Sequence, residues 1–138
     1  MSVRRSHAPL EKVEQAHILQ LIASVGGTAY VLGTRRPKGD YQGTRQTPGV
    51  PDVIAFVPKP TMRGHGMQIA LFIEVKRSVG GRLSPEQSAF RDHCRFSGQE
   101  HVVGGLNAVI AWMVQNGVIT DRQVPHYRLS AHLQRSTM

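Results

Sequence analysis

The sequence predicts a single α/β domain in which a mixed central sheet is flanked by helices. Three observations lead to this prediction. The chain has 138 residues, 40% of them are apolar, and segments of strand composition alternate with segments of helical periodicity. The predicted order of elements is helix, strand, strand, strand, helix, strand, helix.

The first helix is expected over about residues 9–24. Pro9 suits its first turn, apolar residues recur at helical spacing, and two glycines end it. A short strand over residues 28–32 follows. Residues 33–48 contain four basic residues, three glycines and two prolines, so they predict a flexible basic loop. Such a loop is either a solvated surface segment or an arm that orders on nucleic acid.

Two apolar runs predict neighbouring strands over residues 52–57 and 68–75, joined by a turn-rich segment. The second run is nearly continuous in apolar residues, which is typical of a central strand covered on both faces. Ser84 is expected to cap the next helix, with Pro85 in its first turn and Gln87 completing a capping box.

A short strand over residues 101–104 and an apolar helix over residues 106–115 complete the predicted domain, which spans residues 9–117. The helix either covers the sheet or supplies part of a dimer surface. Residues 1–8 are expected to form an N-terminal tail and residues 118–138 a C-terminal extension.

The composition points to a polyanionic partner. Seventeen Lys and Arg against nine Asp and Glu give a net charge of +8, and a basic excess attracts nucleic acid by counterion release. No apolar run approaches the roughly 20 residues of a membrane helix, and no signal-peptide pattern is present. A single cysteine and scattered histidines argue against a disulfide framework or a zinc module. We therefore expect a cytoplasmic protein without a membrane partner or a small-molecule cofactor.

Two acidic residues stand at the edges of the paired apolar runs, where a solvated charge is not expected. Asp52 follows Pro51, and Glu74 is followed by Val75 and Lys76. Strand alternation places Glu74 and Lys76 on one sheet face, while Val75 points into the core and offers its backbone carbonyl. These oxygens suit Mg²⁺ or Mn²⁺, which polarises a phosphate and acidifies a bound water, while an ammonium steadies the developing charge.

An isolated Glu-x-Lys is more often an exposed surface pair, but the order of the motifs favours a site. Pro-Asp, two apolar strands, Glu-Val-Lys and a capped helix together resemble the PD-(D/E)xK nuclease superfamily. Residues 47–54, 72–77 and 83–87 are similar to the VRR-NUC (virus-type replication-repair nuclease) family, over about residues 9–115. The resemblance implies a restriction-endonuclease-like core and a stand-alone domain of the type found in phages and bacteria.

The resemblance also implies roles for individual residues. Asp52 and Glu74 would be metal ligands, Lys76 the catalytic lysine, and Gln87 a site residue in addition to its cap. The family uses a glutamate of the first helix as well, and Glu11 or Glu14 is available here. Gln15 follows Glu11 at the spacing common in the family, which favours Glu11 as a further catalytic residue and ligand.

Together these features predict a magnesium-dependent DNA endonuclease of a bacterial or phage-infected cell. Since a small domain cuts one strand per site, a homodimer acting on branched DNA in recombination or repair, like a Holliday-junction resolvase, is the leading expectation. The alternatives are a restriction-like, nicking or flap endonuclease, and a catalytically silent nucleic-acid-binding module. Six basic side chains are expected to bind the phosphate backbone: Arg35, Arg36, Lys38, Arg45, Arg77 and Arg82. A solvated surface role remains open for each of them.

Overall fold

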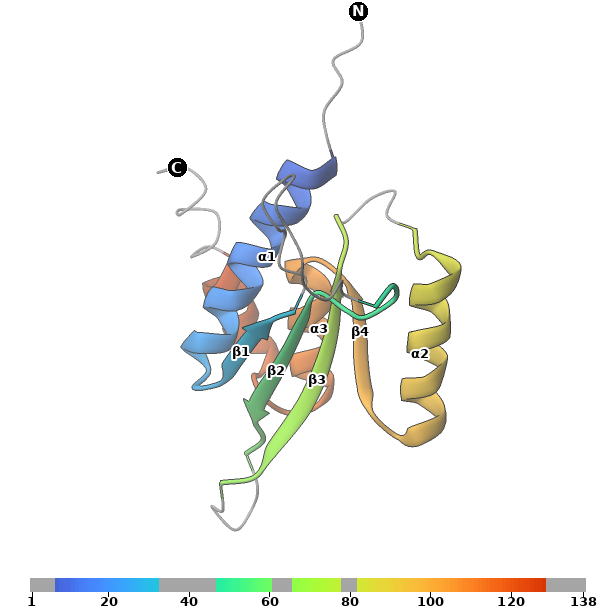
Figure 1. Cartoon of the computed structure of the whole chain (residues 1–138). Coiled ribbons are helices and arrows are strands. Elements are labelled where there is room, and N and C mark those ends of the chain that lie inside the picture. Colours follow the sequence, from blue (N-terminus) through green and yellow to red (C-terminus); the bar gives the residue numbers. More distant parts are fainter. Residues whose placement is uncertain (1–6, 33–46, 61–65, 78–81, 129–138) are drawn as a thin grey trace, which may run out of the picture.

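The four strands form one mixed sheet. The computed structural model describes residues 7–32, 47–60, 66–77 and 82–128 (Figure 1). The second strand is antiparallel to the first and to the third, and the fourth is parallel to the third. Their order in the sheet is that of the sequence, namely β1 (Thr28–Val31), β2 (Val53–Pro58), β3 (Gln68–Val75) and β4 (Glu100–Gly104). The mixed sheet and the order of elements are as predicted.

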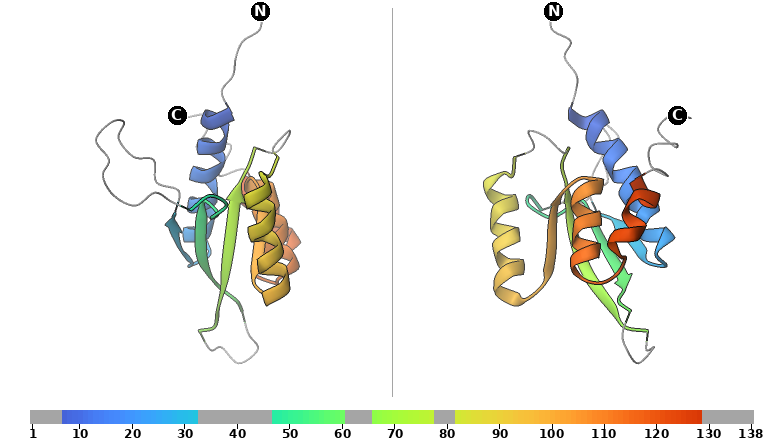
Figure 2. Two further views of the ribbon diagram at one scale, coloured as in Figure 1. Left: turned by 45° about the vertical axis from the view of Figure 1, so that its right-hand side comes forward. Right: turned by 180° about the vertical axis from the view of Figure 1, so that it is seen from behind.

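The helices lie on both sides of this sheet. α1 (His7–Ser24) and α3 (Leu106–Gln115) pack together on one face, and α2 (Pro85–Ser97) stands beside β4 on the other (Figures 1 and 2). α1 begins two residues before the predicted Pro9, a difference within the usual uncertainty of a helix end. A short 3₁₀ helix, η1 (Asp121–Gln123), and helical residues 124–128 follow α3.

The hydrophobic core lies between the sheet and the α1–α3 layer. Val53, Ala55 and Val57 alternate along β2 and are all buried, and α3 buries five of its ten residues. α3 therefore covers the sheet, which was one of the two roles open to it. No helix within the described residues is long and apolar enough to cross a membrane.

The opposite face of the sheet is covered unevenly. On β2 the residues that alternate with the core positions, Ile54 and Phe56, are half-buried. On β3 the C-terminal residues Ile73, Glu74 and Val75 are buried, but residues 68–70 are exposed or half-buried. The prediction that β3 is covered on both faces is thus wrong for its first half, because α2 packs mainly against β4.

Candidate active site

The pairing of β2 with β3 brings two carboxylates together at one end of the sheet. Val53 is the partner of Ile73, so Asp52 and Glu74 lie opposite each other and on the same face. Asp52 Oδ2 accepts a hydrogen bond from the backbone N–H of Val75 at 2.8 Å, which fixes its position. Glu74 is only 4% exposed, and in its protonated form it can donate a hydrogen bond to the Asp52 side chain.

Glu74 is the electrostatically unusual residue of this group. Burial, followed by the negative charge of Asp52 and the hydrogen bond to it, raises the pKa of Glu74 from 4.5 to about 8. Lys76 acts in the opposite direction, since its Nζ lies 3.9 Å from Glu74 Oε2 and its side chain is only 15% exposed. Two acids and one amine therefore share a poorly solvated space, in which a divalent cation would relieve the repulsion between the carboxylates.

Gln87 links this group to the start of α2. Its backbone N–H donates to Ser84 Oγ at 3.0 Å, and its Oε1 accepts from the Ser84 N–H at 2.8 Å, which completes the predicted capping box. With Oε1 held by the cap, Nε2 points to Glu74 and donates to Oε2 at 3.0 Å. One amide thus contributes both to the helix cap and to the orientation of Glu74.

The loop before Asp52 holds α2 against the site. Gly49 has a φ of +95°, a left-handed conformation that favours glycine. A Cβ at this position would also collide with the backbone of Glu86 in the first turn of α2. Pro51 is fully buried next to Asp52. The Gly-Val-Pro-Asp segment therefore positions Asp52 and the helix that carries Gln87 relative to each other.

The two glutamates of α1 have different surroundings. Glu11 is half-buried, and its negative charge is the smallest of the causes that raise the pKa of Glu74, so it lies in the neighbourhood of the site. Glu14 Oε1 accepts from the Leu106 N–H at 2.7 Å at the start of α3. The N-cap residue there is Gly105, which has no side chain to cap the helix and no room for a Cβ beside the Glu14 carboxylate. Glu14 therefore caps α3 across 92 residues of sequence, and the structure favours Glu11 over Glu14 as the acid beside the site.

The predicted phosphate-binding residues are only partly described. Arg77 follows Lys76 and is half-buried, and its Nε is buried without a hydrogen-bond partner among the described residues. Arg82 is exposed, two residues before the cap of α2. Outside the described residues lie Arg35, Arg36, Lys38 and Arg45.

The donor set suits a hard cation. No three His, Cys, Asp or Glu side chains among the described residues form a ready-made metal cluster. Two converging carboxylates are instead typical of Mg²⁺, which binds few protein oxygens and keeps several waters. Zinc commonly takes three or four nitrogen, sulfur or carboxylate ligands, and it fits this set poorly.

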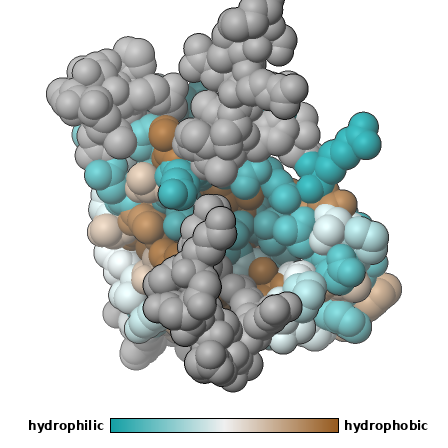
Figure 3. Space-filling view, turned by 45° about the horizontal axis from the view of Figure 1, so that its top comes forward, coloured by the Kyte–Doolittle hydropathy of each residue, from teal (hydrophilic) through white to brown (hydrophobic). Residues whose placement is uncertain are grey.

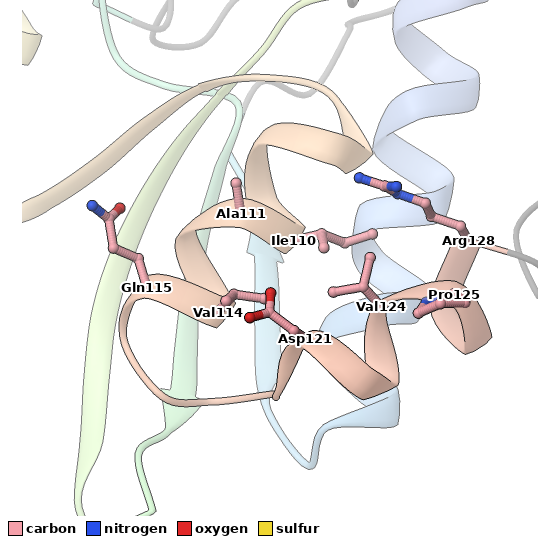
Figure 4. A pocket seen from close by; sticks show the side chains of 8 residues that line it. All are labelled: Ile110, Ala111, Val114, Gln115, Asp121, Val124, Pro125 and Arg128. Atoms are coloured by element: carbon pink, nitrogen blue, oxygen red, sulfur yellow. The ribbon is translucent and has the colours of Figure 1, made fainter.

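A separate groove of about 750 Å³ lies between α3 and residues 121–128. Side chains from both segments line it, including Ile110, Val124 and Arg128 (Figure 4). It contains none of the predicted site residues, and it lies on the α3 side of the sheet rather than the α2 side. The groove is therefore not part of the candidate site.

Two comparisons with known proteins gave matches. A family profile described as the VRR-NUC domain matches residues 6–105. A solved structure described as a VRR_NUC domain superimposes with a TM-score of 0.54 at 21% sequence identity, over 77% of this chain and 95% of that chain. At this identity the likeness establishes the shared fold. The comparison with curated proteins gave no match.

Proposed function

This chain belongs to the VRR-NUC domain family, a nuclease family of the PD-(D/E)xK type, and from that premise we propose that it is a divalent-metal-dependent DNA endonuclease. One observation carries the proposal. The buried Glu74 contacts Asp52 and Gln87 and has the Lys76 amine 3.9 Å away, so acids and an amine from separate motifs converge. An unrelated surface Glu–Lys pair would have neither the burial nor the second carboxylate.

The proposed mechanism assigns one task to each side chain. Asp52, Glu74 and the Val75 carbonyl would hold the cation, Mg²⁺ or Mn²⁺, and Glu11 would assist from α1. Such a cation would polarise the scissile phosphate and increase the acidity of a water at the site. Lys76 orients the nucleophile and stabilises the charge that develops on the phosphate oxygens. The Val75 N–H and the Gln87 amide hold the two carboxylates in place before DNA binds.

DNA recognition is proposed to depend on the backbone. The net charge of +8 favours phosphate contacts, and Arg77 and Arg82 lie next to the ends of the elements that carry the site. The four basic residues between positions 33 and 48 would add further contacts to the DNA phosphates.

The preferred substrate is proposed to be branched DNA, cut by a homodimer during recombination or repair. One such site hydrolyses one strand, and a two-fold pair of sites matches the symmetry of a four-way junction. A restriction-like, nicking or flap endonuclease would use the same residues on another DNA shape. A catalytically silent binding module would keep the basic surface without cleavage.

These alternatives can be separated by one cleavage experiment. A four-way junction, a flap and a linear duplex of matched sequence are incubated with Mg²⁺ or with EDTA. The proteins are wild type, Glu74→Ala and Lys76→Ala, with Glu86→Ala and Lys59→Ala as controls because both residues are exposed and lie outside the proposed site. We expect cleavage only with Mg²⁺, at least a ~100-fold loss in the two site variants, and near wild-type rates in the controls.

The pattern of products identifies the substrate class. Paired symmetric nicks in the junction, with a mass in solution of two chains by light scattering, support the resolvase. Cuts confined to linear duplex favour the restriction type, and cuts confined to the flap favour a flap endonuclease. DNA binding without cleavage in either Mg²⁺ or Mn²⁺ would refute the enzyme proposal and leave the silent module.

A further inference from the structure

An open part of the sheet adjoins the candidate site. α2 packs on β4 and reaches β3 through Phe90, whose ring meets Phe72 edge-on at 5.3 Å between centroids. On β1 and β2 the same sheet face carries Tyr30, Ile54 and Phe56. Among the described elements, no helix lies over this part of the sheet (Figures 1 and 2). Hydrophobic and hydrophilic surface lie side by side when the molecule is viewed towards the end that carries the carboxylates (Figure 3).

Tyr30 is the aromatic residue that this face presents to solvent. Its side chain is 54% exposed, although it lies within a strand. It stands opposite Ile54, and its ring meets Phe56 at 6.1 Å between centroids with an interplanar angle of 80°. Phe56 therefore supports the Tyr30 ring in an edge-to-face contact of the kind that aromatic pairs prefer. The ring is held in place and much of its surface remains free.

Tyr30 is close to the carboxylates. Asp52 lies two residues before Ile54, the partner of Tyr30, so both residues are on the same face. Neighbouring strands are about 4.8 Å apart and two residues along a strand span about 6.8 Å, which places the two Cα atoms about 8 Å apart. Phosphates of one stacked DNA strand rise about 3.4 Å per nucleotide. A base within two or three nucleotides of the cleaved phosphate can therefore reach the ring.

Only some bases can use such a ring. A base in a continuous duplex is stacked on both sides, whereas an unpaired base can place its face on an aromatic side chain. A protein with a net charge of +8 will also hold the adjoining phosphates of a single strand. The ligand expected for an exposed aromatic ring next to a phosphate-cleaving centre is therefore a nucleobase.

We propose that Tyr30 stacks on an unpaired base beside the scissile phosphate, so that DNA with unpaired nucleotides at the cut is preferred to continuous duplex. This inference rests on the nuclease function proposed above and narrows its substrate class. It also explains why branched DNA would bind more tightly than continuous duplex, since forks and open junction centres contain unpaired bases. Stacking on an aromatic side chain should strengthen binding of the unpaired substrate by about 5-fold to about 150-fold.

The test measures stacking separately from cleavage. Two DNA molecules of identical sequence are used, one fully paired and one with two unpaired nucleotides, each carrying the fluorescent base 2-aminopurine at the same position. Binding is titrated in EDTA with wild type, Tyr30→Phe, Tyr30→Ala and Phe96→Ala. Phe96 is the matched control, because it is 89% exposed but lies near the end of α2 opposite to Gln87.

We expect wild type, Tyr30→Phe and Phe96→Ala to quench the unpaired 2-aminopurine, and Tyr30→Ala not to quench it. Tyr30→Ala should raise Kd for the unpaired DNA at least about 5-fold and leave Kd for the duplex nearly unchanged. Thermal unfolding establishes that each variant is folded. Unchanged quenching in folded Tyr30→Ala would overturn the inference, as would equal loss of affinity for both DNAs. A fall in mass from two chains to one in Tyr30→Ala would also overturn it, by identifying this face as a contact between copies.

Cleavage assays in Mg²⁺ distinguish failure of the endonuclease proposal from failure of the stacking inference. If wild type quenches the unpaired base but cuts neither DNA in Mg²⁺ or Mn²⁺, the endonuclease proposal is wrong and stacking stands. If wild type cuts and Tyr30→Ala cuts both DNAs at wild-type rates, the stacking inference is wrong and the endonuclease proposal stands.

Discussion

Replacing Glu74 by Gln should stabilise the metal-free protein at alkaline pH while abolishing cleavage. Glutamine has the shape of a protonated glutamic acid, so it can accept from Gln87 Nε2 and donate to Asp52 as the protonated side chain does. It cannot ionise. The difference in free energy of unfolding between wild type and Glu74→Gln therefore measures the cost of ionising a buried acid beside Asp52.

The direction and size of the effect follow from the pKa of Glu74. Since folding raises this pKa from 4.5 to about 8, the folded state binds one proton more than the unfolded state between these values. The contribution of Glu74 to stability is thus fully present below about pH 4.5 and is lost as pH rises through about 8, at up to ~1.4 kcal/mol per pH unit. The upper bound across the window is about 5 kcal/mol, which local relaxation and water entry will reduce.

The measurement is denaturant unfolding of both proteins in EDTA from about pH 5 to about pH 9. All other titrating groups are common to the two chains, so the difference in free energy of unfolding should grow in favour of Glu74→Gln as pH rises to about 8 and level off above that value. Saturating Mg²⁺ should reduce the pH dependence of wild type, since a bound cation stabilises the ionised acid. Parallel stability curves for the two proteins in EDTA would refute the electrostatic account of the site.

Three further predictions follow from the same geometry. Binding of Mg²⁺ at about pH 7.5 should release protons, detected by calorimetry in buffers of different ionisation enthalpy, because Glu74 must give up its proton; the signal should vanish in Glu74→Gln. Gly49→Ala should lower the free energy of unfolding by about 1–3 kcal/mol in denaturant unfolding, because the left-handed backbone and the Glu86 carbonyl both oppose a Cβ. Gly66→Ala is the matched control and should be nearly neutral, because nothing lies near its added methyl group. Glu14→Ala should cost about 1–2 kcal/mol of stability without weakening Mg²⁺ binding, whereas Glu11→Gln should weaken Mg²⁺ binding in calorimetry and leave stability nearly unchanged.

The parts of the fold that were predictable depend on local or periodic signals. The start of α2 is set by Ser84, Pro85 and Gln87, which lie within one turn, and the structure has the expected cap. The convergence of Asp52 and Glu74 was predictable because the two residues flank consecutive apolar strands. Antiparallel neighbours of similar length align such ends at one edge of the sheet.

The parts that were not predictable depend on contacts between distant segments. Nothing near Leu106 indicates that a carboxylate 92 residues away caps α3, although a glycine in place of a capping residue is a clue that the donor must be satisfied elsewhere. The second hydrogen bond of the Gln87 side chain, to Glu74, also requires the placement of α2 against β3. The open face around Tyr30 is a property of the path of α2, which no periodicity in β1 reveals.

The site combines a destabilising arrangement with local bonds that maintain it. Asp52 and Glu74 repel each other when both are ionised, and burial makes this repulsion stronger. They stay in place because each is also held by a neutral donor, Asp52 by the Val75 N–H and Glu74 by the Gln87 amide. These donors carry no charge, so they hold the two side chains in place without supplying the counter-charge that a cation would supply. The Gln87 amide is in turn fixed by the cap of α2, so the start of that helix controls the orientation of Glu74. A substitution of Ser84 should therefore weaken metal binding although Ser84 is not itself a proposed ligand.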